Sequence, residues 1–82
     1  MTRTYYRISM YVGPVHVAHY AANARRAGFT DIVEGTERIY ATVAAEPFSD
    51  DTDRLLLRHR VAEAVYGEPG MSGGWRDVVV IR

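Results

Sequence analysis

The sequence contains no cysteine, which excludes disulfide bridges, thiolate metal sites and cysteine nucleophiles. Lysine and glutamine are also absent, and Asn23 is the only asparagine. All basic residues are therefore arginines, in a chain rich in alanine and valine. This bias is typical of a high-GC genome. An arginine at a given position is thus weaker evidence for selected guanidinium chemistry than it would be in a mixed Lys/Arg sequence.

An excess of one charge and long apolar runs are missing as well. Ten basic residues balance ten acidic ones, and zero net charge argues against a protein that coats nucleic acid. No apolar run approaches the length of a membrane span, and the N-terminus has no apolar signal segment. We therefore expect a soluble cytoplasmic protein. Its 82 residues, 48% of them hydrophobic, predict a single folded domain over residues 1–82.

Alternating apolar residues predict a first strand over residues 4–12. Its core side consists of Tyr6, Ile8, Met10 and Val12. Gly13-Pro14 follows, and proline is favoured at the first position of a helix. We expect that helix over residues 14–27, with an apolar stripe of Val17, Ala21 and Ala24.

The middle of the sequence predicts a hairpin, with strands at 30–34 and 37–45 around a turn at Gly35-Thr36. A second helix is expected from an N-cap at Ser49 or Asp50 to about Tyr66. Its predicted buried stripe is Leu57, Val61, Ala64 and Val65. A glycine-rich loop over 67–74 and a final strand over 75–82 complete the chain.

This order of elements, β-α-β-β-α-β, resembles the ferredoxin-like, or split βαβ, topology. The resemblance spans the whole chain. It implies an α+β two-layer sandwich in which both helices cover one face of a four-stranded antiparallel sheet. It identifies no specific family, because many unrelated functions share this topology.

In such a sheet the first and third strands are central, and one face has no helix over it. Outward positions of these strands predict a shared surface of Tyr5, Arg7, Tyr11, Arg38 and Tyr40. RNA-recognition domains use a similar face, but the stretch "ERIYATVAA" lacks the glycine-aromatic signature of their third strand. Tyrosine and arginine are also enriched at protein interfaces, so a protein contact is the preferred hypothesis.

The last strand gives a second indication of an interaction. Its continuous apolar run is expected at the edge of the sheet, where unpaired backbone invites strand addition. Some of these side chains must point away from the helices whichever register holds. The predicted edge consists of Val78, Val79, Val80 and Ile81.

Three patterns that resemble chemical sites lack essential residues. His16 and His19 have the spacing of metal ligands, but a zinc site needs three or four converging ligands, so we expect no metal. The stretch "VGPVHVAHY" resembles the phosphate-binding loop of acylphosphatases, yet Ala21 stands near the place of that family's arginine. The glycine-rich stretch "GEPGMSGGW" lacks the lysine of a nucleotide-binding loop.

We therefore expect a small non-enzymatic interaction or regulatory protein without a cofactor. Its expected partner is another protein, including a second copy of the chain as a homodimer. A phage or accessory protein that acts on a bacterial host protein fits the size and composition. The alternative is single-stranded nucleic-acid binding by the same face. A weaker third hypothesis is an acylphosphatase-like or anion-binding domain.

Overall fold

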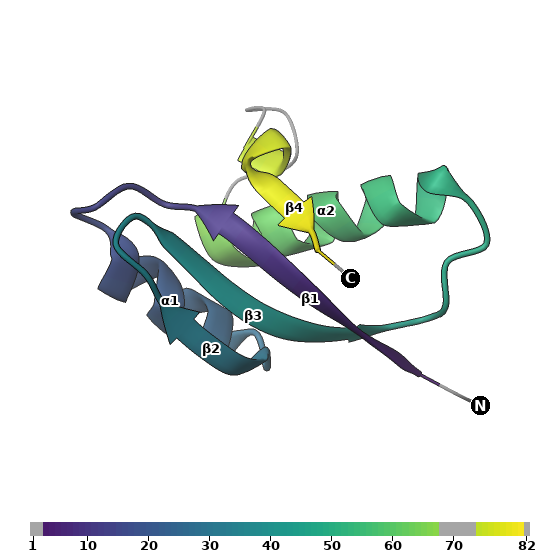
Figure 1. The fold of residues 1–82 in the computed structure, drawn as a ribbon, viewed down its shortest axis with the longest axis horizontal. Helices are drawn as coiled ribbons and strands as arrows, with labels where there is room; N and C mark the ends of the chain where they lie inside the picture. Colours follow the sequence, from purple (N-terminus) through teal and green to yellow (C-terminus); the bar gives the residue numbers. More distant parts are fainter. Residues whose placement is uncertain (1–2, 68–73, 82) are drawn as a thin grey trace.

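In the computed structural model, which describes residues 3–67 and 74–81, the chain forms one sheet and two α-helices (Figure 1). The strands are β1 (Thr4–Tyr11), β2 (Thr30–Glu34), β3 (Arg38–Ala45) and β4 (Val78–Val80). The helices are α1 (Val17–Arg26) and α2 (Asp51–Tyr66), and a short 3-10 helix, η1 (Gly74–Asp77), precedes β4. Most of the predicted glycine-rich loop, at 68–73, lies outside the described residues.

The four strands form an antiparallel sheet in the order β2-β3-β1-β4. The prediction of an α+β fold with such a sheet and two helices is confirmed, as is the central position of β1 and β3. These two strands pair without interruption from Thr4 opposite Ala45 to Tyr11 opposite Arg38. The register therefore fixes which of their side chains share a face.

Both helices lie behind the sheet in the view of Figure 1, and they contact each other there. The core fills the space between these two layers. It includes the predicted inward side of β1 and, from β3, Ile39, Ala41 and Val43. The predicted stripe of α1 is buried as well, and α2 contributes Leu57, Val61, Ala62 and Val65. Ala64, predicted in that stripe, is only half-buried, and Ala62 is buried instead.

Helix α1 starts three residues later than predicted, at Val17 rather than Pro14. The backbone N–H groups of Val12 and Gly13 both donate to the carbonyl of Glu37, which holds the chain beside β3 beyond the end of β1. Gly13 then takes a φ of +79°, a left-handed conformation that glycine adopts readily. The chain therefore leaves β3 and turns over residues 14–16 before its first helical residue.

The final strand is also shorter than predicted, because η1 takes up residues that were expected to extend it. The prediction of a strand over 75–82 is wrong for residues 75–77 and for Ile81, which follows the end of β4, and residue 82 lies outside the described residues. Trp75 stacks on His59 of α2 with ring centroids 4.8 Å apart, and this contact holds the segment against the helix. The apolar run in the sequence thus predicted where β4 lies. The residue at which β4 starts depends on the tertiary contact of the Trp75 ring.

Candidate interaction surface

The sheet face opposite the helices, hereafter the open face, carries all five residues predicted from β1 and β3. Tyr5, Arg7 and Tyr11 alternate with the buried core positions of β1, and Arg38 and Tyr40 do so on β3. Val33 pairs with Tyr40, and Val79 pairs with Ser9, so both belong to the same face. Ile81 extends this register by donating its N–H to the carbonyl of Arg7 at 2.8 Å.

Exposed apolar and aromatic side chains concentrate on the open face. Of the eight large hydrophobic residues exposed in the described part of the chain, five are Tyr5, Tyr11, Val33, Val79 and Ile81. Tyr5 is 69% exposed and Tyr11 is 42% exposed. The other three, Val15, Leu55 and Leu56, lie in the turn before α1 and on α2. Clustered exposure of this kind marks a contact surface more reliably than the scattered exposure of single residues.

Arg7 crosses the sheet and is held in place by neutral oxygens. Its Nη1 donates to the carbonyl of Asp31 at 2.6 Å and to the hydroxyl of Thr42 at 3.0 Å. Asp31 lies where the pairing of β2 with β3 is irregular, and it has a φ of +50°. The irregular backbone at β2 thus presents a carbonyl to the guanidinium, a contact that sequence reasoning did not predict.

Arg38 is held in a similar way from the other central strand. Its Nε donates to the hydroxyl of Ser9 at 2.8 Å, and Ser9 is buried beneath it with 5% exposure. Both arginines are half-buried. Within the described residues the one ion pair joins Arg25 to Glu34, so neither arginine of the open face has a carboxylate partner within 4.0 Å. Two positioned cations therefore stand among tyrosines without a direct ion pair in the described part of the chain.

Strand β4 lies at the edge of the sheet, as predicted, with Val78 and Val80 in the core and Val79 and Ile81 exposed. This edge is short and partly occupied. Arg58 of α2 donates from Nε to the carbonyl of Val78 at 2.8 Å. An edge of three residues with one carbonyl already paired is a poor template for strand addition, so the open face is the better candidate surface.

Sequence reasoning missed the cluster around Trp75, the only tryptophan in the chain. The guanidinium carbon atoms of Arg58 and Arg76 lie 5.0 and 5.3 Å from the ring centroid, and His59 stacks against the ring. Arg58 and His59 are adjacent on a helix, but nothing in their spacing indicates a tryptophan far along the chain. The cluster joins η1 to α2. The cations that lie over the Trp75 ring are arginines of the same chain.

The three histidines do not converge. His16 and His19 contact the ring of Tyr20 edge-on, whereas His59 lies against Trp75. Across the described part of the chain no group of three or more His, Asp or Glu side chains is placed to hold a metal ion. The histidines of α1 belong to an aromatic cluster in which Tyr20 also packs edge-on against Tyr66.

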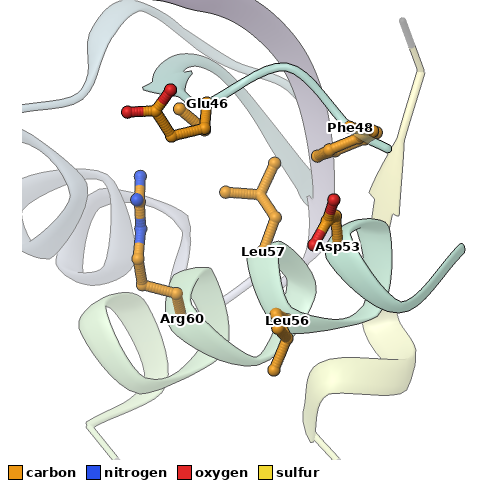
Figure 2. Close-up of a pocket in the computed structure, with 7 residues that line it drawn as sticks. Glu46, Phe48, Asp53, Leu56, Leu57 and Arg60 are labelled. Atoms are coloured by element: carbon orange, nitrogen blue, oxygen red, sulfur yellow. The ribbon is translucent and has the colours of Figure 1, made fainter. Parts of the chain in front are cut away.

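A shallow hollow of about 240 Å³ lies between the end of β3 and the first half of α2 (Figure 2). Arg60 and Glu46 face each other at one end, and Phe48 and Asp53 lie at the other, with Leu57 between them. Asp53 accepts hydrogen bonds from the N–H and hydroxyl of Ser49, and these lower the pKa of its carboxyl. Arg60 donates to the carbonyl of Ala44. Asp53 thus holds the loop before α2 and Arg60 contacts the end of β3, and the hollow is smaller than a typical ligand pocket.

The backbone amides at the turn before α1 are partly engaged within the fold. The backbone N–H groups of Val12 and Gly13 already donate to Glu37, and Asn23 of α1 donates to the carbonyl of Val65 on α2 at 2.9 Å. Two amides of this turn and the only asparagine of the chain are therefore engaged in holding the fold together.

Comparison with known proteins adds no relative: no family model matches the chain, and no curated protein or solved structure matches it significantly. Neither of the two described α-helices has the length and apolar character to cross a membrane.

Proposed function

We propose that this chain is a ferredoxin-like interaction domain that binds another protein through its open face. Read from the other edge, the strand order is β4-β1-β3-β2, with α1 after β1 and α2 after β3. That order supports the ferredoxin-like topology. Such a sheet offers a flat, rigid platform, because the pairing of β1 with β3 fixes the spacing of every outward side chain.

The observation that carries this proposal is the concentration of exposed Tyr5, Tyr11, Val33, Val79 and Ile81 on one uncovered face. Tyrosines provide a large contact area at low entropic cost, and they are enriched where binding energy concentrates. The chemistry of an enzyme is not favoured, since the hollow beside α2 is small and two of its charged groups, Asp53 and Arg60, hold the loop before α2 and the end of β3.

The second candidate function is single-strand nucleic-acid binding, favoured by the combination of tyrosines and arginines on this face. Two observations rank it lower. The chain has zero net charge and a pI near 6.8, whereas nucleic-acid-binding domains are usually basic. Strand pairing also assigns two arginines to the open face, whereas strong binding to a phosphate backbone uses many cations.

The test is affinity capture from the native cell extract, with Tyr5→Ala combined with Tyr11→Ala as the variant. Both tyrosines are exposed, so their truncation should leave the fold intact while reducing capture at least about tenfold.

The matched control is Val15→Ala, which truncates a side chain that is 84% exposed but lies away from the open face. It should capture the same proteins as the unmodified chain. If the double tyrosine variant retains every partner at the same level, the open face is not the binding surface.

A further inference from the structure

Resting on this proposed function, we propose that the partner presents acidic side chains to the open face, so that the surface accepts an acidic protein segment rather than a second copy of the chain. Arg7 and Arg38 are the charged residues of this face. Its other outward positions on β1 and β3 are Tyr5, Ser9, Tyr11, Tyr40, Thr42 and Ala44. Thr30, Val33, Val79 and Ile81 share the face through their register, so none of the positions that strand pairing assigns to it carries a negative charge.

Arg7 and Arg38 are both held in positions from which they can bind an anion. Each guanidinium is positioned by hydroxyl or backbone carbonyl oxygens, which orient it without neutralising it. Glu34, the nearest acidic residue on β2 to Val33, instead pairs with Arg25 of α1 at 3.1 Å. A carboxylate brought to either arginine would form a charge-assisted and partly desolvated hydrogen bond, which is stronger than its neutral counterpart.

A second copy fits this surface poorly. Packing two open faces against each other would bring four guanidinium groups into one interface and supply no carboxylate from either face. Juxtaposed like charges oppose association and act against the wrong partner. The charge distribution therefore favours a partner of opposite sign over the homodimer.

A nucleic acid carries the required negative charge, but it does not match the apolar side chains of the open face. Strong binding to a phosphate backbone uses many cations, whereas the open face holds two. Val33, Val79 and Ile81 are each about half exposed, and burying them requires apolar groups on the partner. An acidic protein segment with aromatic or aliphatic neighbours provides both.

The register also sets the spacing of the acidic groups. The pair Arg7–Thr42 and the pair Tyr11–Arg38 are separated by the pair Ser9–Tyr40. At roughly 3.3 Å per residue, the two arginine backbones lie about 13 Å apart along the sheet. An extended segment covers this distance in four residues, and Arg38 reaches back to Ser9, so we expect acidic residues separated by at most about that spacing.

The experiment is a selection of random 12-residue peptides displayed on phage against the immobilised full chain. We expect enriched peptides to carry Asp or Glu beside aromatic or aliphatic residues, and their affinity to fall with added salt. Arg7→Gln combined with Arg38→Gln should weaken the best peptide roughly tenfold, equivalent to about 1.4 kcal/mol.

The control is Arg26→Gln combined with Arg54→Gln, which removes the same charge from exposed positions on the helices and should change the affinity less than about twofold. If circular dichroism shows that Arg7→Gln impairs folding, Arg38→Gln is used alone. We then expect the affinity for the peptide to fall about threefold.

The outcomes separate the two proposals. Binding that depends on Tyr5 and Tyr11 but not on the two arginines, or enriched peptides that are neutral or basic, overturns the acidic partner and leaves the interaction surface standing. Tighter binding of a labelled oligothymidylate than of any peptide, or a dimer by light scattering that the peptide dissociates, also overturns it. A selection that enriches nothing counts against both proposals.

Discussion

At the scale of single residues, Tyr66 joins the end of α2 to the end of β1. Its hydroxyl donates to the carbonyl of Tyr11 at 2.7 Å, and its ring packs against Tyr20. Burial is the main cause that raises the pKa of the Tyr66 phenol above its ordinary value of 10.0, and the nearby negative charge of Asp77 adds to it. The neutral phenol is thus the form that the folded state prefers.

Replacing Tyr66 with phenylalanine should therefore destabilise the protein in a pH-dependent way. At pH 7 the lost hydrogen bond should cost about 1 kcal/mol, or roughly 1 M in the urea midpoint. Because the pKa of Tyr66 is raised in the folded state, the neutral phenol stabilises the fold fully below pH 10. Above pH 10 the phenol of the unfolded chain loses its proton first, so this contribution to the free energy of unfolding falls as the pH rises. The difference between Tyr66→Phe and the unmodified chain should shrink between pH 9 and pH 11.

Tyr5→Phe is the control for this measurement, since it removes the same hydroxyl from a largely exposed side chain. A constant difference between the Tyr66→Phe and unmodified proteins across this pH range would contradict the assignment.

At the scale of elements, the sequence predicted every strand and both α-helices but neither η1 nor all of the ends. Alternation located β1 and β3, because their inward residues fill the core, and the glycine at position 67 marked the end of α2 with a φ of +76°. Asp50 was one of the two expected N-caps, and it accepts from the N–H groups of Thr52 and Asp53. Each of these signals lies within a few residues of the helix or strand end that it marks, so it can be recognised in the sequence alone.

The remaining ends depend on contacts between distant residues. The start of α1 depends on Glu37, and the start of β4 depends on Trp75 and His59. For the candidate surface, alternation placed the tyrosines and arginines on one face, and the topology brought them together. The hydrogen bonds that hold Arg7 and Arg38 could not be predicted, because they depend on the register and on the irregular backbone at Asp31.

Arg58 is expected to anchor η1 and β4 to α2. Its guanidinium donates to the carbonyl of Val78, reaches that of Arg76 at 3.5 Å, and lies over the ring of Trp75. Arg58→Ala should therefore cost about 2 kcal/mol and shift the fluorescence of the single tryptophan to longer wavelength. It should also promote self-association, because the carbonyl of Val78 at the sheet edge becomes available.

Arg54→Ala, one turn earlier on α2, removes a guanidinium that lies over Phe48 and should leave the Trp75 emission unchanged. Equal emission spectra for the Arg58→Ala and unmodified proteins would show that Arg58 does not anchor this segment.

At the scale of the whole molecule, the sheet separates stability from recognition. Its helix-facing side holds the core, and its open face holds the exposed tyrosines, valines and positioned arginines. A chain of 82 residues has a free energy of unfolding of only about 4–12 kcal/mol, so single core residues account for a large share of it. Residues on the open face contribute little to the free energy of unfolding and are available for a partner.

Ile8 and Val79 test this separation, because they lie on neighbouring rows of the same sheet with opposite orientations. Ile8 is fully buried, and Ile8→Ala should cost about 2–5 kcal/mol, enough to unfold part of the population at 25 °C. Val79 is 47% exposed opposite Ser9, so Val79→Ala should change stability by less than about 1 kcal/mol but weaken capture of the partner. Urea unfolding and affinity capture of both variants give the two readouts. A Val79→Ala protein that loses stability as severely as Ile8→Ala would place Val79 in the core, whereas undiminished capture by a folded Val79→Ala protein would place the binding surface elsewhere.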